Sequence, residues 1–177
     1  EKEIALCCLD SNMTFLKTCI PSITAFEYLI KKYDVKLNLD LYCSAHLIDK
    51  NYFNSWIKPL KTSTDNRITY YDRHPPSKIF GPNNYGCISH QVFCDLNYSY
   101  LECLYFGVPI VHNSKYFEDF GFYYTNYNTN DAGEKIFEMI STYNSNYKKH
   151  LKKNSKIFDK YSPKNPSIIK KYKEMIE

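Results

Sequence analysis

The stretch "ISHQVFCDLNYSYLECLYFGVPIVHN", residues Ile88–Asn113, decides the fold prediction. It runs from a strand-like apolar end through a polar loop and a helix into a second apolar strand. Ser89, His90 and Gln91 stand where the first strand should stop. Glu102 is a lone carboxylate in a predicted helix that is otherwise apolar and aromatic. A carboxylate in that position raises the question of what it binds.

The rest of the sequence alternates short apolar runs with helical patterns. Strands are predicted at Ile4–Leu9, Leu37–Cys43, Ile68–Tyr71, Tyr85–Ser89, Pro109–Val111 and Phe122–Tyr124. Helices are predicted at Phe15–Tyr33 with a kink at Pro21, at Asn51–Leu60, as a turn within Pro75–Asn83, at Tyr98–Phe106 up to Gly107, and from Ala132 onward with a break at Ser162–Pro166. This alternation predicts parallel βαβ units in a sheet covered on both faces. The expected fold class is α/β: a Rossmann-like, doubly wound parallel sheet of about six strands with C-terminal helices.

The length of 177 residues predicts one domain, residues 1–177. The sequence starts at Glu1 without a methionine, as the later part of a longer protein would. Its net charge of +4 comes mostly from lysines near the end: Lys148, Lys149, Lys152, Lys153, Lys156, Lys160, Lys164, Lys170, Lys171 and Lys173. They are interpreted as a solvated helix face, with a nucleic-acid stripe as the alternative. Because arginine, the preferred reader of base edges, occurs only at Arg67 and Arg73, no nucleic-acid partner is predicted.

The seven cysteines are odd in number, and no pair has zinc-site spacing. Buried free thiols in a reducing compartment, the cytoplasm, are therefore expected. No metal site and no membrane-spanning segment are predicted. The sequence has five glycines but neither a GxGxxG fingerprint nor a Walker loop, which argues against the dinucleotide and P-loop classes.

The junction between the polar loop and the helix is the most informative site. Asn97 and Ser99 lie at or near the predicted helix start. Free backbone N–H groups and the positive end of the helix dipole can hold a phosphate there. Glu102 follows about one turn later, where its carboxylate could accept two hydrogen bonds from a vicinal diol such as a ribose. The alternative is an ordinary helix with a solvated glutamate.

The segment "CDLNYSYLECLYFGVPIVHN" resembles the donor-site motif of GT-B glycosyltransferases. In that superfamily a loop leads into a helix that carries a glutamate, followed by a small-residue turn, Gly-x-Pro and a strand. Glu102, Gly107 and Pro109 match these features. The pattern is most similar to a GT-B-like group from bacteria and large viruses. Its core covers Ser89–Tyr124, and the predicted order of strands and helices extends the similarity over the chain.

The resemblance implies the C-terminal, donor-binding domain of a two-domain enzyme. The substrate would be a nucleotide-sugar, and the acceptor, a glycan or a protein, would bind through an N-terminal domain that the sequence lacks. The resemblance also implies that neither a metal nor another cofactor is needed. Without transferase chemistry, the same fold would be a non-catalytic Rossmann-like binding module, which is the alternative hypothesis.

The resemblance further implies a set of site residues. The donor-binding candidates are Asn12, Lys17, Arg73, Ser89, His90, Asn97, Tyr98, Ser99, Glu102 and His112, with Glu102 also the catalytic candidate. Lys17 occupies the place of a lysine that neutralises the diphosphate after the first strand, in a segment that begins at Asp10. Arg73, with Asp72 and His74 beside it, follows the third strand, where a nucleobase pocket is expected.

Some of these assignments stay open. A structural role for His90 and His112 is an equal alternative. The tyrosines fit packing better than sugar stacking: Tyr98, Tyr100, Tyr105, Tyr123 and Tyr124. Cys94 stands where retaining members carry a first glutamate, with Asp95 beside it as a substitute, so a retaining or inverting outcome is not assigned. The enzyme hypothesis requires that Lys17, Asn97 and Glu102 converge on one cleft.

Overall fold

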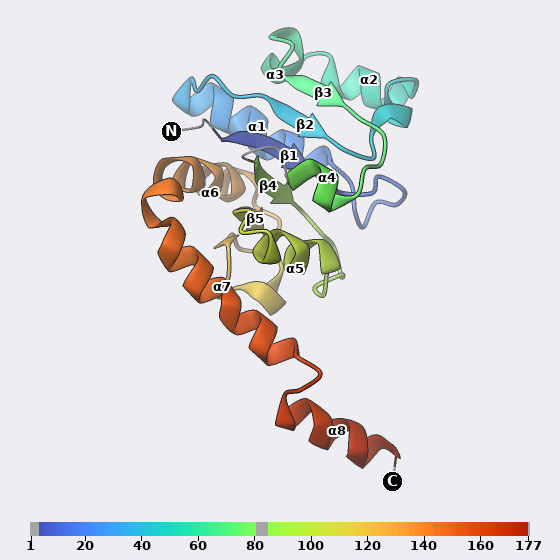
Figure 1. Cartoon of the computed structure of the whole chain (residues 1–177). Helices are drawn as coiled ribbons and strands as arrows, with labels where there is room; N and C mark the ends of the chain where they lie inside the picture. Colours follow the sequence, from blue (N-terminus) through green and yellow to red (C-terminus); the bar gives the residue numbers. More distant parts are fainter. Residues whose placement is uncertain (1–3, 81–84, 177) are drawn as a thin grey trace.

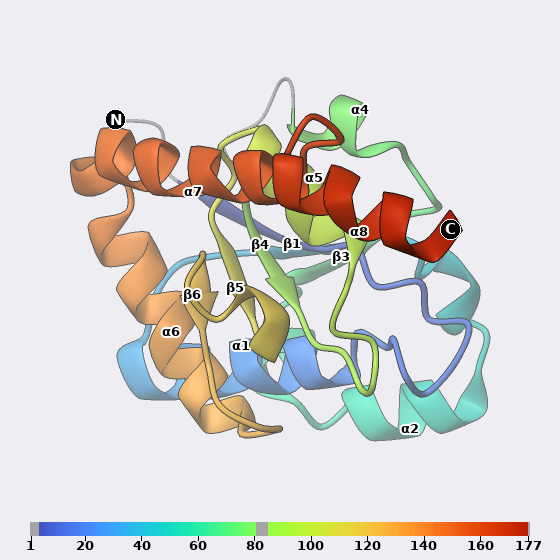
Figure 2. The same cartoon turned by 90° about the horizontal axis from the view of Figure 1, so that it is seen from below.

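The computed structural model describes residues 4–80 and 85–176. Its centre is a six-stranded sheet in the order β3-β2-β1-β4-β5-β6, in which all neighbouring strands are parallel (Figures 1 and 2). The strands are β1 (Ala5–Cys8), β2 (Leu39–Leu41), β3 (Ile68–Tyr70), β4 (Tyr85–Ser89), β5 (Ile110–His112) and β6 (Phe122–Tyr123). The predicted Rossmann-like, doubly wound α/β fold is therefore confirmed. The strand order reverses between β1 and β4.

Helices follow most of the strands. They are α1 (Ile20–Tyr33), α2 (Asn51–Ile57), α3 (Lys61–Thr64), α4 (Pro76–Phe80), α5 (Tyr98–Tyr105), α6 (Thr129–Thr142), α7 (Tyr147–Tyr161) and α8 (Pro166–Ile176), with 3-10 turns η1 (Ala45–Leu47), η2 (Lys115–Phe117) and η3 (Asn144–Asn146). Within residues 4–80 and 85–176, none of these helices combines the length and apolar character needed to cross a bilayer.

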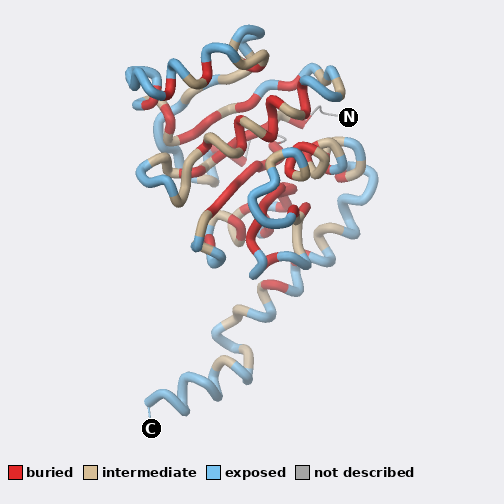
Figure 3. Tube along the Cα trace, turned by 180° about the vertical axis from the view of Figure 1, so that it is seen from behind, coloured by how far each residue is buried: buried red, intermediate tan, exposed pale blue. Residues whose placement is uncertain are grey.

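Successive strand residues point to opposite faces of the sheet, and each face has its own core. Leu6, Cys8 and Ile88 pack with α1, α2 and α6 on one face. Cys7 and Cys87 pack with α4, α5 and α7 on the other. Figure 3 shows the buried positions concentrated in the sheet and on the inner sides of these helices. A near-continuous apolar strand is thus explained by burial on both faces.

The structure corrects several predicted boundaries. The first helix begins at Ile20 rather than at Phe15, and Thr14 and Lys17 instead form an isolated antiparallel bridge. Pro21 lies in the first turn of α1, where its missing N–H has no helical partner to lose, so it causes no kink. The predicted turn at Pro75–Asn83 contains α4, and its residues 81–83 lie outside the described part of the chain.

The C-terminal segment is helical as predicted, with one additional break at η3. α7 packs on the domain through Ile157, whereas α8 buries no residue and extends away from the sheet (Figure 1). The ten lysines named above are all exposed, as a solvated helix face requires. The seven cysteines are free thiols; five are buried, and Cys43 and Cys94 are half-buried.

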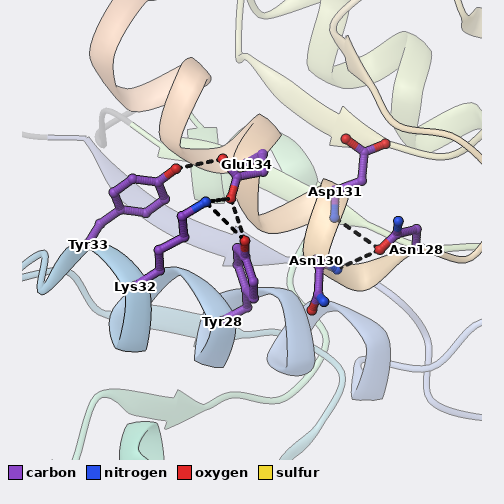
Figure 4. Close-up of polar contacts among 7 residues, drawn as sticks. All are labelled: Tyr28, Lys32, Tyr33, Asn128, Asn130, Asp131 and Glu134. Carbon is purple, nitrogen blue, oxygen red and sulfur yellow. Dashed lines mark hydrogen bonds and ion pairs between the residues drawn. The ribbon is translucent and has the colours of Figure 1, made fainter.

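One polar cluster joins α1 to α6 (Figure 4). The Glu134 carboxylate accepts hydrogen bonds from Lys32 Nζ, Tyr28 Oη and Tyr33 Oη, each at 2.6 Å. These donors lower the pKa of Glu134 to about 2. A Cβ on the neighbouring Gly133 would lie 3.0 Å from the carbonyl oxygen of Ala25, so the two helices approach closely at this point. The cluster therefore ties a helix of the β1–β3 half to a helix of the β4–β6 half.

Candidate functional site

A cavity of about 510 Å³ opens at the carboxyl ends of β1 to β4, where the strand order reverses. Doubly wound sheets bind ligands at this position, because the loops after neighbouring strands diverge there. The volume lies within the range of about 300–1,000 Å³ that is usual for small-molecule sites. Three walls surround it, and each comes from a different part of the sequence.

The first wall is the loop between β1 and α1. Lys17 lines the cavity and is half-buried. Its backbone is fixed by hydrogen bonds from Asn12 N to Lys17 O (3.0 Å) and from Lys17 N to Thr14 O (3.3 Å). Asn12 holds the loop together, because its Nδ2 donates to the carbonyls of Asp10 and Cys43 and its Oδ1 accepts from Cys19 N. Asn12 therefore positions Lys17 and does not itself line the cavity.

The second wall consists of the loops after β2 and β3. His46, Asp72 and Arg73 line the cavity from this side, and all three are exposed. Arg73 forms no ion pair within residues 4–80 and 85–176, so its five N–H donors are available to a ligand. Its place after the third strand is the one predicted for a nucleobase pocket.

The third wall combines the end of β4 with the start of α5. Ser89, Asn97, Ser99 and Tyr100 line it. Asn97 caps α5: its Oδ1 accepts from Ser99 N (3.2 Å), and its carbonyl accepts from Tyr100 N (3.0 Å). The helix N-terminus thus faces the cavity on the same side as Ser89, which is the arrangement that suits an anion. Tyr98, the first residue of the helix, is 73% exposed and does not line the cavity.

Two further residues line the cavity that the predicted set omitted. Asp10 is 4% exposed, and its Oδ1 accepts from Ser89 Oγ at 2.8 Å. Tyr100 is buried, and its Oη has no hydrogen-bond partner among the described residues. Burial, and after it the negative charge of Asp10, raises the pKa of Tyr100 well above its ordinary value, against a smaller opposing effect of the nearby Ser89 hydroxyl, so the Tyr100 hydroxyl is neutral. A buried donor without an acceptor, beside a cavity, is ready to bind a ligand oxygen.

The two candidate histidines are held inside the protein. His90 Nδ1 lies 2.7 Å from Tyr124 Oη. His112 Nε2 donates to Phe120 O (2.8 Å), and its Nδ1 accepts from Ser114 N (3.2 Å). Burial lowers the pKa of each to about 4, so both rings are neutral near pH 7. Neither ring lines the cavity, and the geometry agrees with the structural alternative for both.

Glu102 lies on α5, half-buried, and does not line the cavity. Residues three apart on a helix share a face, so Glu102 lies one turn beyond Ser99 on the side that Ser99 turns to the cavity. Its carboxylate makes no hydrogen bond or ion pair to the residues described. Of the three residues required to converge, Lys17 and Asn97 line the cavity and Glu102 does not, so the convergence is met only in part.

The loop before α5 has Cys94 where retaining GT-B enzymes carry a first glutamate, and Asp95 is the possible substitute beside it. Asp95 is exposed and lines a separate, smaller cavity of about 240 Å³. It accepts a hydrogen bond from Gln91 Nε2 (2.9 Å). Cys94 is half-buried beside it, and its backbone N–H is bound by Gln91 Oε1. Asp95 therefore does not face the larger cavity. In the described part of the chain, no three His, Cys, Asp or Glu side chains are grouped to hold a metal ion.

The ten predicted binding residues thus divide evenly. Those that line the cavity are Lys17, Arg73, Ser89, Asn97 and Ser99; those that do not are Asn12, His90, Tyr98, Glu102 and His112. Ser89 and Asp10 stand 79 positions apart in the sequence and are joined by a hydrogen bond at the cavity floor. The parallel pairing of β1 with β4 brings them together.

Glycosyltransferases are among the solved structures that share this fold. A TarM variant of S. aureus, solved with fondaparinux, alpha-GlcNAc-glycerol and UDP, has 18% sequence identity and a TM-score of 0.70, covering 98% of this chain and 36% of that one. A glycosyltransferase of Rickettsia africae has 14% identity and a TM-score of 0.70, covering 99% and 48%. HepE of Anabaena, solved with UDP and glucose, has 10% identity and a TM-score of 0.70, covering 98% and 48%.

The chain therefore spans about a third to a half of the length of these solved structures. At these identities the likeness concerns the fold, which is the Rossmann-like fold of GT-B glycosyltransferase domains. A search of curated proteins found no match. A family model covers residues 1–176, and the chain accordingly belongs to the family described as "Protein of unknown function (DUF2827)".

Proposed function

We propose that this chain is the donor-binding domain of a GT-B glycosyltransferase and that its cavity receives a nucleotide-sugar. The observation that carries the proposal is the meeting of Lys17 with the capped N-terminus of α5 in one cavity at the strand reversal. A lysine charge and a helix N-terminus are two independent means of binding a phosphate. The glycosyltransferase fold, and the UDP present in two of the solved structures, support the same ligand class.

The cavity walls suggest how the ligand would lie. The diphosphate would bind between Lys17 and the Asn97–Ser99 turn, where N–H groups and a positive charge are available. The nucleoside would extend toward Arg73, whose guanidinium can form two parallel hydrogen bonds. Glu102, one turn beyond Ser99, would accept hydrogen bonds from the ribose hydroxyls. The acceptor, a glycan or a protein, would bind to a part of the enzyme outside these residues, and the free thiols favour the cytoplasm.

A non-catalytic binding module is the second candidate function. It is favoured by Cys94 at the position of the first glutamate and by Asp95 facing away from the larger cavity. Both functions require nucleotide binding, and they differ in the transfer of the sugar. Isothermal titration with UDP, GDP, UDP-glucose and GDP-mannose tests the shared step. Absence of heat with all four ligands contradicts both functions.

Replacing Lys17 with alanine is expected to weaken nucleoside diphosphate binding by about 1.5–3 kcal/mol, the size of a lost hydrogen bond to a charged group. The free energy of unfolding should change little, because no hydrogen bond or ion pair of Lys17 Nζ is formed within the described chain. Lys152→Ala is the matched control, since Lys152 is an exposed lysine of α7 outside the cavity. Equal affinity and equal salt dependence in the two variants would remove Lys17 from the phosphate site.

Replacing Tyr100 with phenylalanine should leave the protein as stable or slightly more stable, because the hydroxyl it deletes is buried without a partner. Nucleotide affinity should nevertheless fall about threefold to tenfold, as expected for one neutral hydrogen bond. Tyr161→Phe deletes another buried hydroxyl, one that lies near Tyr116 and does not line the cavity, and it should not alter affinity. Thermal unfolding and titration calorimetry measure the two effects. A Tyr100→Phe variant with unchanged affinity would show that the hydroxyl does not contact the ligand.

A further inference from the structure

A carboxyl group without a counter-ion forms part of the cavity floor. Asp10 Oδ1 accepts from Ser89 Oγ at 2.8 Å, and Oδ2 accepts from Cys8 Sγ and His90 N, each at 3.3 Å. No lysine, arginine or histidine forms an ion pair with it within residues 4–80 and 85–176. Burial raises the pKa of Asp10 to about 7, against the opposing effect of the hydrogen bonds from Ser89 and Cys8.

The groups around Asp10 offer it no positive charge. The titratable side chains that act on it are Cys8, Cys19, Cys43, Cys87, Tyr100 and Tyr124. Cys8, Cys87 and Tyr100 lie in β1, β4 and α5, and the other three lie next to α1, β2 and β6. Each is a thiol or a phenol, neutral or negative. His90 adds only its backbone N–H, since its ring is neutral near pH 7. The cations of the cavity, Lys17 and Arg73, line its other walls.

An ionised Asp10 would repel the negatively charged ligand that the proposed function requires. A diphosphate in the same cavity would bring negative charges close to an ionised Asp10, in a site partly shielded from water where repulsion is strong. A cation or a proton can remove the conflict. No basic side chain pairs with Asp10 in the described part of the chain, and a proton from solvent can neutralise it.

We propose that Asp10 takes up one proton from solvent when a phosphorylated ligand enters the cavity. Its carboxyl group then becomes neutral, and the Ser89 hydroxyl is free to donate a hydrogen bond to the ligand. The inference rests on the proposed function. In the free protein Ser89 Oγ–H donates to Asp10 Oδ1. Once Oδ1 carries the proton, the O–H donates to Ser89 Oγ, and the serine hydroxyl hydrogen turns toward a ligand oxygen. The hydrogen bonds from Cys8 and His90 to Oδ2 are retained.

The affinity for the ligand should fall as pH rises above the pKa of Asp10. Below about pH 6 Asp10 is already protonated, so binding takes up no proton and affinity is constant. Above about pH 7 the free protein has lost this proton and must regain it, so affinity should fall as pH rises, by up to about tenfold per unit. A nucleotide-sugar is the suitable probe, because its diphosphate lacks the terminal phosphate proton that titrates near about pH 6.

The test is titration calorimetry of UDP-glucose and GDP-mannose at about pH 8, in two buffers of different ionisation enthalpy. The wild type should take up close to one proton per ligand bound. Asp10→Asn should bind with no proton uptake and at least as tightly at that pH. Asparagine can keep its oxygen toward His90 N and its amide toward Ser89, which imitates the protonated acid.

His46→Asn is the matched control, because His46 is a second ionisable side chain that lines the same cavity. Proton uptake should persist in this variant. Binding of the sugar nucleotide by the wild type without proton uptake, and with constant affinity from about pH 6 to 8.5, overturns the inference and leaves the proposed function intact. Loss of uptake in His46→Asn, or its persistence in Asp10→Asn, also overturns it. Failure of both ligands to bind the wild type defeats the proposed function and the inference together.

Discussion

Gly121→Ala is expected to destabilise the protein by about 2–5 kcal/mol, the sum of about 1–2 for a left-handed backbone and about 1–3 for overpacking. Gly121 has a φ of +62°, which alanine adopts only with strain. A Cβ at this position would lie 2.6 Å from Ile110 O, 3.0 Å from Ile110 Cγ2 and 3.2 Å from His112 Cδ2. The closest of these atoms belongs to the backbone of β5, so the strand itself would have to move.

Gly107→Ala is the matched control. Gly107 also has a positive φ, +68°, but its Cβ would first meet the ends of the Leu151 and Tyr147 side chains, at 2.9 and 3.0 Å. Side-chain ends can turn aside, so this variant should lose only about 1–2 kcal/mol, the backbone contribution. Urea denaturation measures both differences. A Gly121→Ala variant no less stable than Gly107→Ala would mean that β5 tolerates displacement at Ile110.

The second large effect concerns Glu102→Gln. Glutamine keeps the size and the helix propensity of glutamate, but it replaces one carboxylate oxygen with a donor. If Glu102 accepts hydrogen bonds from two ribose hydroxyls, the loss is about 1.5–3 kcal/mol, as for a hydrogen bond to a charged acceptor. Affinity for a nucleotide-sugar should then fall about tenfold or more, since ~1.4 kcal/mol is one decade.

Pyrophosphate separates the possible roles of Glu102. The capped start of α5 is unchanged in Glu102→Gln, so pyrophosphate should bind the variant as it binds the wild type. Glu174→Gln, an exposed position on α8, provides the charge-matched control. A melting temperature and a nucleotide affinity that both stay constant would identify Glu102 as a surface residue. A fall in stability with a proportionate fall in binding would indicate a structural carboxylate.

The alternation of strands and helices predicted the sheet correctly, because the central strands β1 and β4 are buried on both faces and helical segments separate most of the strands. The start of α1 was misplaced for a reason outside local sequence. Phe15 fits an apolar helical pattern, yet it is 79% exposed in a loop. That loop is held by the side chain of Asn12, which binds the carbonyl of Cys43, 31 positions away, and by its left-handed backbone at φ 56°. Neither this hydrogen bond nor this backbone conformation can be inferred from helical periodicity.

Only part of the cavity lining was predicted, again because contacts between residues far apart in the sequence decide the rest. Asn97 and Ser99 were found because the start of their helix can be located from the sequence, whereas Lys17 was assigned through the resemblance to GT-B glycosyltransferases. Asp10 lies two residues beyond the end of β1, but its burial depends on packing against β4, which a single sequence does not specify. Tyr100 was interpreted as packing, which is correct for its ring; the unpartnered hydroxyl emerges only when the neighbours of Oη are known.

The position of β4 beside β1 also has a consequence for the order of events in folding. Each half of the sheet is continuous in sequence, whereas the β1–β4 pairing closes a long loop, a step whose entropic cost is met late. The cavity has walls from both halves, so it exists only after that pairing. A ligand bound there would stabilise the completed sheet and neither half alone. Its kinetic effect would therefore be to slow unfolding rather than to accelerate folding.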